Sequence, residues 1–319
     1  MYVANLNIGH KKRTLCKAAL YVILTLQPAI SSAGTLPSGS IAPATPTTSS
    51  FTTKMSTNAH AEFQKGVYWT RMNQHARATQ SWMVAAKLGN PEAQFNLGDA
   101  YYFGTGIDKN LKKAAHWWTM AAQAGNTSAQ NNLGYAYAHG QGVPEDPQKA
   151  IYWWTQAANK DDDHAQLLLG LAQYYGRGTP QNYRNANTWF IRSAHHDNPI
   201  AEIALARDYA RGYGIPQDYN RAFEWFLRAA KQGNLSGQLS VGANYYEGQG
   251  TPKNTEKAIY WWSKAAIRGS QKAELLLGIA YHDDPSAQNQ EQSEYWLKKA
   301  KAGGGKIGTL AEHLLDKQK

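Results

Sequence analysis

Residues 91–126 read PEAQFNLGDAYYFGTGIDKNLKKAAHWWTMAAQAGN, and the chain repeats this pattern every 36 residues. The second block, residues 127–162, reads TSAQNNLGYAYAHGQGVPEDPQKAIYWWTQAANKDD, and four more blocks begin at residues 163, 199, 235 and 271. The sixth block has one residue fewer in its loop. A fixed period of about 20 to 50 residues is the signature of a repeat array, in which each unit packs on its neighbours. We therefore expect one array of six repeats over residues 91–306.

The first half of each block has the spacing of an amphipathic helix. Counting from 1 at the start of each block, position 3 is Ala or Gly, position 7 is Leu or Val, position 8 is Gly or Ala, and position 11 is Tyr or Gln. Intervals of three and four residues place these side chains on one helix face. A glycine inside a helix costs about 1 kcal/mol relative to alanine, so its recurrence at position 8 indicates that a partner helix approaches closely there.

A turn and a second helix follow. Glycines at positions 14 and 16 of the first five blocks permit backbone angles that other residues avoid, so they are expected to end the first helix. Position 20 is expected to cap the second helix through a side-chain oxygen, and it is occupied by Asn110, Asp146, Asn182, Asp218 and Asn254. This G-x-G follows a helix and lacks a third glycine, so it is not a dinucleotide-binding fingerprint.

The second helix carries Ala at position 24, Trp at position 27, Trp or Phe at position 28 and small residues at positions 31 and 32 in the first five blocks. We expect the aromatic rings to fill the space between consecutive repeats. Their recurrence at one phase favours structural packing over a stripe that stacks on sugars or bases.

The pattern A-x-x-x-L-G-x-x-Y-x-x-G-x-G, followed by A-x-x-W-W/F-x-x-A-A, resembles the Sel-one-like repeat, a helical relative of the tetratricopeptide repeat. The resemblance covers about residues 91–304. It implies an all-α fold, a right-handed α-solenoid of antiparallel helix pairs whose first helices line a concave surface. It also implies an adaptor role in protein–protein interaction, in bacteria frequently by exported proteins. Some exported members carry a disulfide in each repeat, whereas the single cysteine of this chain is Cys16.

The N-terminal segment has the pattern of an export signal. In residues 1–33 a basic stretch, Lys11 to Lys17, precedes the apolar run from Ala18 to Leu26, and small residues end at Ala33. This is the three-part pattern of a secretory signal peptide, and a retained membrane anchor is the alternative. The apolar run is shorter than the ~20 residues that a spanning helix needs. We therefore expect a periplasmic or secreted protein with no stable membrane span after cleavage.

The segments on either side of the array have different expected roles. Residues 34–58 are rich in Ser, Thr and Pro and are expected to form a flexible linker. Residues 59–90 resemble one repeat with a shorter loop, which predicts an atypical tetratricopeptide-like first repeat. Residues 307–319 read as an amphipathic capping helix with Leu310, Leu314 and Leu315 facing the array.

Composition and motifs argue against several function classes. The net charge is +10, but four of the bases lie in the N-terminal segment and the repeats contain no run of Lys or Arg, so we expect no nucleic-acid partner. The array has no H-E-x-x-H and no G-x-S-x-G, and it has no cysteine nucleophile. We expect neither an enzyme nor a cofactor, and a hydrolase of cell-wall or drug substrates remains a remote alternative.

Two turns rich in Asp and His contain candidate ligands for a metal ion. Asp161 to His164 and His195 to Asp197 lie one period apart and therefore near the same edge of a solenoid. Carboxylate and imidazole groups could hold a divalent cation between them. Solvated turn residues and helix caps account for the same residues, and we predict no metal site.

If positions 3, 7, 8 and 11 pack inward, positions 5, 9, 12 and 13 face the groove, and these vary from repeat to repeat. Variation on a fixed framework, with Tyr and Arg among the residues, is typical of a recognition surface. The candidate partner-binding residues are Phe95, Asp99, Tyr102, Tyr135, His139, Leu171, Tyr174, Tyr175, Arg207, Arg211, Tyr246, Glu247 and His282. The same positions also include Phe103, Asn131, Leu167, Ile203, Leu239, Leu275 and Ile279.

The sequence thus favours an exported adaptor that binds a protein partner in the groove of an α-solenoid. Three narrower versions remain open: a subunit of an envelope machine, an inhibitor or immunity protein that blocks a toxic effector, and a secreted host-interaction factor.

Overall fold

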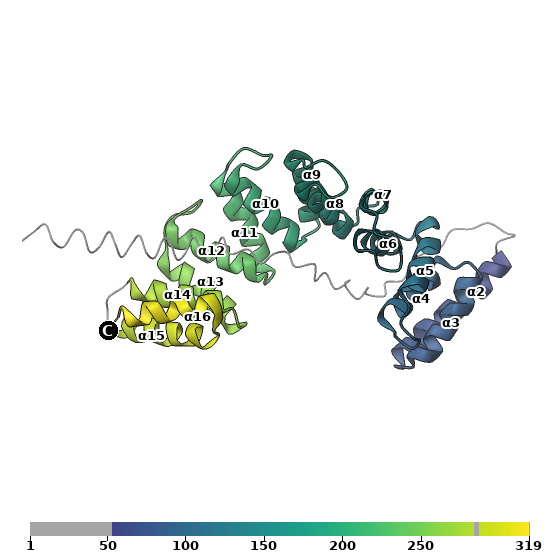
Figure 1. Cartoon of the computed structure of the whole chain (residues 1–319), viewed down its shortest axis with the longest axis horizontal. Helices are drawn as coiled ribbons and strands as arrows, with labels where there is room; N and C mark the ends of the chain where they lie inside the picture. The colour runs from purple at the N-terminus through teal and green to yellow at the C-terminus, as the bar shows by residue number, and fades with distance from the viewer. Residues whose placement is uncertain (1–52, 284–286, 319) are drawn as a thin grey trace, which may run out of the picture. The chain divides into compact units, whose positions relative to one another are not determined.

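The computed structural model describes residues 53–283 and 287–318, and these form fifteen α-helices and no β-strand (Figure 1). In chain order the helices are α2 (Thr53–Arg71), α3 (His75–Lys87), α4 (Pro91–Phe103), α5 (Leu111–Gln123), α6 (Thr127–His139), α7 (Pro147–Ala158), α8 (Asp163–Tyr175), α9 (Tyr183–His195), α10 (Pro199–Arg211), α11 (Tyr219–Lys231), α12 (Leu235–Glu247), α13 (Thr255–Ile267), α14 (Gln271–His282), α15 (Ala287–Ala302) and α16 (Gly305–Asp316). The expected signal peptide, residues 1–33, lies outside the described residues, as does the loop 284–286.

The chain divides into two compact units, each built from consecutive helix pairs. One unit ends at His196 and contains α2 to α9, and the other begins at Asp197 and contains α10 to α16. Within each unit every helix packs on the next one in the chain. The predicted fold class, an all-α solenoid of helix pairs repeating every 36 residues, is confirmed.

The glycine loop has the conformation that the sequence predicts. Gly104 ends α4 with a φ of 74° and Gly106 follows with a φ of 70°, both in the left-handed region. A Cβ atom on Gly106 would also lie 2.4 Å from the backbone carbonyl of His75, at the start of α3. Glycine is therefore required there both by the backbone angle and by the close approach of the preceding repeat.

The helix caps are also as predicted. The side-chain oxygens at position 20 accept hydrogen bonds from backbone N–H groups in the first turn of each second helix, at 2.8 to 3.0 Å. The first helices are capped in the same way from the last residue of the preceding block, by Asn90, Asn126, Asp162, Asn198, Asn234 and Ser270. Both helices of each of the first five repeats thus begin at a side-chain cap.

The aromatic rings at position 28 pack within their own helix pair. The ring at position 28 lies on the position-8 glycine of its own repeat, as Trp118 does on Gly98 and Trp154 on Gly134. These rings are buried, whereas Trp117 and Trp153 at position 27 are only half-buried. The ring at position 28 therefore packs directly against the small residue at position 8.

The ends of the array are closed by further helices. Helix α2 begins at Thr53, so residues 53–58 of the expected linker are helical. The ring of Trp82 in α3 packs against Gly66 of α2. Helix α16 packs on α15, and Leu310, Leu314 and Leu315 contact the core of the last repeats. No helix in residues 53–283 or 287–318 combines the length and apolar character needed to cross a membrane.

Candidate functional site

The residues at position 13, the last helical residue of each first helix in the first five repeats, form what we call the variable edge. All five are exposed, and the aromatic members Phe103 and Tyr175 expose 48% and 47% of their surface. The variable edge consists of Phe103, His139 and Tyr175 in the unit that contains α2 to α9, and of Arg211 and Glu247 at the same repeat position in the unit that contains α10 to α16. One position thus presents five different side chains on a constant framework.

The rings at position 12 support the variable edge from behind. Tyr102 is half-buried, meets Phe103 edge-on at 4.9 Å between ring centroids, and donates its hydroxyl to Gln141 of the next repeat at 2.8 Å. Tyr174 meets Tyr175 at 5.0 Å in the same way. These contacts fix the exposed aromatic rings before any partner arrives, which lowers the entropic cost of binding.

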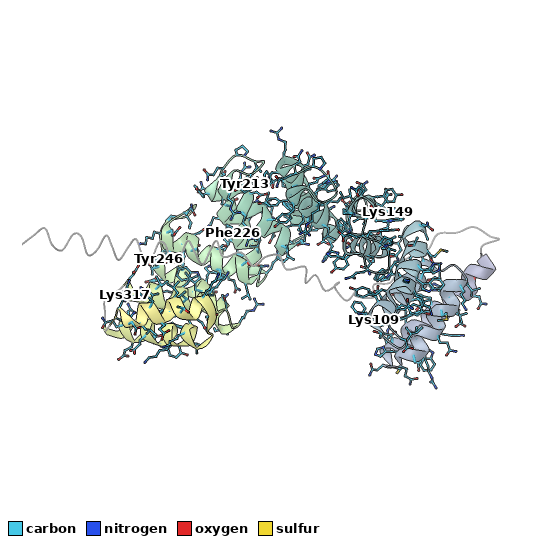
Figure 2. The ribbon with its side chains drawn as sticks, viewed as in Figure 1. Lys109, Lys149, Tyr213, Phe226, Tyr246 and Lys317 are labelled. Atoms are coloured by element: carbon cyan, nitrogen blue, oxygen red, sulfur yellow. The ribbon has the colours of Figure 1, made fainter. Side chains whose placement is uncertain are left out.

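The first helices of the fifth and sixth repeats also carry a ring at position 12, and each of these rings contacts a polar side chain later in the chain. Tyr246, near the end of α12 (Figure 2), donates its hydroxyl to Asp283 of the next repeat. His282 is half-buried, and its Nδ1 lies 3.2 Å from the side-chain nitrogen of Gln318, after α16. The ring of His282 is thus held by the C-terminal end of the chain.

Asp99 is a framework residue. Its Oδ1 accepts hydrogen bonds from the indole N–H of Trp118 at 2.9 Å and from the side-chain amide of Asn132 at 3.0 Å. Burial raises the pKa of this carboxyl to about 7, against the lowering effect of the two hydrogen bonds. Asp99 therefore ties one helix pair to the next repeat.

Several of the expected groove residues fill the core, so their assignment to a groove was wrong. Leu167, Ile203 and Leu275 at position 5 expose 5%, 6% and 0% of their surface, and Ile279 at position 9 exposes 2%. Large aliphatic side chains at these positions reach neighbouring helices, because the buried face of the first helix is wider than the spacing 3–7–11 indicates. Phe95, Leu171 and Arg207 are half-buried.

Tyr135 and His139 form a stacked pair on α6. Their ring centroids are 4.1 Å apart, and His139 Nδ1 lies 3.0 Å from the backbone carbonyl of Tyr135. The imidazole of His139 is exposed and the phenol of Tyr135 is half-buried. This pair gives the second repeat a flat polar and aromatic surface at the variable edge.

Sequence reasoning missed the residues at position 4, which join repeats. In four repeats a buried glutamine donates its side-chain N–H to the carbonyl of an alanine eight residues earlier, at the end of the preceding second helix: Gln94, Gln130, Gln166 and Gln238. The signal that could have found them is a polar residue recurring beside the buried alanine at position 3.

Glu202 replaces this glutamine in α10 and is fully buried. Its Oε1 lies 3.1 Å from Nε of Arg228, and its Oε2 accepts a hydrogen bond from Gln232 at 2.9 Å. Burial raises the pKa of Glu202 to about 7, although the charge of Arg228 lowers it. Arg228 also reaches Asp197, with Nη2 2.7 Å from Oδ1.

Asp208 is a second buried carboxyl of α10. It exposes 1% of its surface, and its Oδ2 has no hydrogen-bond partner among the residues that the structure describes. Burial raises its pKa to about 7, and the charges of Arg211 and Arg207 only partly offset this rise. Four other repeats have alanine at this position: Ala100, Ala136, Ala172 and Ala280.

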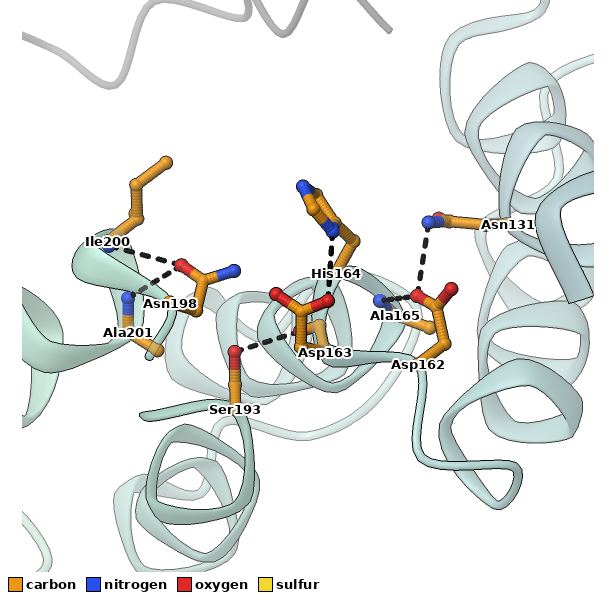
Figure 3. A network of polar contacts seen from close by, with 9 residues as sticks. All are labelled: Asn131, Asp162, Asp163, His164, Ala165, Ser193, Asn198, Ile200 and Ala201. Carbon is orange, nitrogen blue, oxygen red and sulfur yellow. Dashed lines mark hydrogen bonds and ion pairs between the residues drawn. The ribbon is translucent and has the colours of Figure 1, made fainter. Parts of the chain in front are cut away.

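The turn residues considered for metal have structural partners. Figure 3 shows Asp162 accepting hydrogen bonds from Ala165 N, at 2.7 Å, and from the side chain of Asn131, at 3.3 Å. His164 Nδ1 lies 3.1 Å from Asp163 Oδ1, a contact that raises the pKa of the imidazole. Across the part of the chain that the structure describes, no group of three or more His, Cys, Asp or Glu side chains could hold a metal ion.

Six Sel1 repeats match the chain, over residues 91–126, 127–162, 163–198, 199–234, 235–270 and 271–305. The chain belongs to the Sel1 repeat family. Proteins built from Sel1 repeats generally mediate protein–protein interactions, and the scaffold is generally non-catalytic. Among curated proteins no match is found.

Two solved structures of this family resemble the chain over most of its length. A protective antigen present in uropathogenic Escherichia coli strains, which displays an SLR fold, is 31% identical with a TM-score of 0.71, and the match covers 78% of this chain and 54% of that one. The chain thus spans about half the length of that antigen. A Sel1 repeat protein from Oxalobacter formigenes is 29% identical with a TM-score of 0.66, and the match covers 75% of this chain and 96% of that one.

Proposed function

We propose that the protein is an exported adaptor that binds a protein partner through the ends of its first helices. The observation that carries the proposal is the variable edge: five exposed and chemically different residues at one repeat position. Two of these residues, Phe103 and Tyr175, are aromatic rings that expose nearly half of their surface. Aromatic and arginine side chains held on a rigid framework are the residue types that anchor protein interfaces.

Preorganisation supports binding at this edge. Tyr175 is held between Tyr174, at 5.0 Å, and the guanidinium of Arg177, at 5.8 Å from its ring centroid. In α10 the guanidinium of Arg211 lies 5.8 Å from the ring of Tyr213. A partner therefore meets side chains whose positions are already restricted, and loses little conformational entropy in ordering them.

Two observations support export. The N-terminal 33 residues have the order of basic, apolar and small-residue stretches found in signal peptides. The relative from uropathogenic Escherichia coli is described as a protective antigen, which fits a protein that leaves the cytoplasm.

Affinity capture from envelope extract tests the proposal. The full chain is expected to retain one protein, and the variants Tyr175→Ala and Arg211→Ala are each expected to retain it about tenfold less well, because interface anchors contribute more than 1 kcal/mol. Tyr152→Ala is the matched control, since Tyr152 exposes 55% of its surface on a second helix. Equal retention by all four proteins would refute binding at the variable edge.

A further inference from the structure

A repeated constellation lies on the second helices α13 and α15, where no partner-binding role has been assigned. The sequences Tyr260-Trp261-Trp262-Ser263-Lys264 and Tyr295-Trp296-Leu297-Lys298-Lys299 share the pattern Tyr-Trp-x-x-Lys. We call the residues Tyr260, Trp261, Lys264, Tyr295, Trp296 and Lys299 the aromatic–lysine patch. Both copies occupy the same phase of consecutive repeats, so they project from the same side of this unit.

The two copies have the same internal geometry. Tyr260 meets Trp261 edge-on at 5.4 Å between centroids, and Tyr295 meets Trp296 edge-on at 5.1 Å. Lys264 Nζ lies 5.2 Å from the centroid of Trp261, and Lys299 Nζ lies 5.1 Å from that of Trp296. Each copy therefore holds a phenol, an indole and an ammonium group together, with Trp261 buried at 9% exposure and Trp296 half-buried.

The patch leaves apolar surface in water. Tyr260 and Tyr295 expose 53% and 55% of their surface. Ile267 exposes 81%, more than any other exposed large hydrophobic residue among the described residues. It lies seven residues after Tyr260, which places it on the same face of α13.

Basic residues follow these rings in both helices, whereas the acidic residues Glu256, Glu291 and Glu294 precede them. Residues 260–268 and 295–301 contain five basic residues and no acidic residue. Three of the bases have acidic partners: Lys298 contacts Glu294 at 2.7 Å, Lys299 contacts the largely buried Glu274 at 3.5 Å, and Lys301 contacts Glu312 at 2.8 Å. Lys264 and Arg268 are exposed at the Ile267 end of α13.

We propose that the aromatic–lysine patch binds an anionic lipid surface. Tyr and Trp rings are enriched where an apolar phase meets water, and basic side chains are attracted to anionic headgroups. Ile267 enters the boundary of the acyl chains, Tyr260, Tyr295 and Trp296 lie at headgroup level, and Lys264 and Arg268 contact phosphate groups. A protein partner fits less well, because lysine is depleted in protein interfaces. This proposal concerns the second helices and does not depend on partner binding at the variable edge.

The second repeat supplies an internal control. Tyr152 and Trp153 form the same edge-on pair at 5.0 Å, and Tyr152 exposes 55% of its surface. Gln156 and Asn159 stand at the phases of Lys264 and Ile267. This repeat therefore has the aromatic pair without a base at the phase of Lys264 or an aliphatic residue at the phase of Ile267, although Lys160 stands at the phase of Arg268.

A polarity-sensitive dye on the full chain tests the proposal. In a Cys16→Ser background, the dye is attached at Ile267→Cys or at Asn159→Cys, and vesicles of phosphatidylcholine with or without phosphatidylglycerol are added. We expect the emission from position 267 to rise and shift to the blue with the anionic vesicles only, and to lose this response in high salt. The dye at position 159 is expected to stay unchanged.

Charge-reversal variants supply the second measurement. Lys264→Glu is expected to weaken co-sedimentation with the anionic vesicles about tenfold, and Gln156→Glu is expected to leave it unchanged. Equal responses of the two dyes, or a Lys264→Glu variant that sediments like the parent, would overturn the proposal. A response at position 267 that depends on protein concentration without lipid would also overturn it, in favour of a contact between copies.

Discussion

The indole of Trp154 lies so close to Gly134 that a Cβ atom on Gly134 would come within 2.4 Å of its Nε1. This contact joins α6 to α7 inside one repeat, and the same glycine–ring contact recurs in α4–α5, α8–α9 and α12–α13. Gly134→Ala is expected to lower the free energy of unfolding by about 1–2 kcal/mol. The expected cost of overpacking, about 1–3 kcal/mol, exceeds the gain of about 1 kcal/mol in helix propensity. Urea unfolding measures the difference.

A second substitution, at Trp154, tests whether the loss of stability in Gly134→Ala comes from the clash with the indole ring or from a change in the backbone. In α10–α11 the equivalent residues are Ala206 and Phe226, which are both buried. Adding Trp154→Phe to Gly134→Ala is therefore expected to recover part of the lost stability. A Gly134→Ala variant that unfolds at the same urea concentration as the parent would show that the ring has room to move.

Asp208 predicts a pH-dependent stability. Its pKa is about 7 in the folded protein and 3.8 ordinarily, so the folded state retains a proton that the unfolded state has released. Stability therefore falls as pH rises from about 4 to about 7, and the loss is complete above pH 7. Asp99 and Glu202, whose pKa values are also raised to about 7, contribute with the same sign.

Asp208→Ala tests this account, because alanine occupies the same position in four other repeats. The variant is expected to be about 1–2 kcal/mol more stable than the parent at pH 8 and nearly equal to it at pH 4. Thermal unfolding across this range measures the difference. A variant that is less stable than the parent at pH 8 would mean that Asp208 makes a net stabilising contact with Arg207 or Arg211.

We expect Arg228 to stabilise the fold because its positive charge is paired with the buried carboxylate of Glu202. Arg228→Ala leaves the buried carboxylate without its cation and is expected to cost about 1–2 kcal/mol at pH 8, discounted because Arg228 is itself 42% exposed. The cost is expected to shrink at pH 5, where Glu202 keeps a proton. Adding Glu202→Gln, the residue found at this position in four repeats, is expected to restore stability. No rescue would show that Arg228 acts by packing on Trp225, 4.7 Å from its centroid.

Helix ends could be predicted from sequence residue by residue because capping is local. Asn254 caps the N–H of Lys257, only three residues away, and the G-x-G turn depends on the glycines themselves. The role of Asp99 could not be predicted in this way. Its partner Asn132 lies 33 residues further along, and only the packing of one repeat on the next decides which polar residues meet.

The candidate site was predictable in part for the same reason. Exposure of Tyr175 and Arg211 at position 13 follows from their place at the end of a helix, next to the glycine turn. The burial of Ile203 and Leu275 at position 5 depends on how much of the first helix is covered by its neighbouring helices. The spacing of the small residues in the sequence does not predict that coverage. The variable edge is therefore narrower than the groove expected from the sequence.

Site-specific photo-crosslinking tests the central claim most directly. A photoreactive amino acid is placed at Tyr175, 47% exposed on the variable edge, or at Tyr152, 55% exposed on a second helix, and the protein is irradiated in envelope extract. The account predicts a covalent adduct with one protein from position 175 and none with that protein from position 152. An adduct formed from position 152 alone, or equally from both positions, would contradict it.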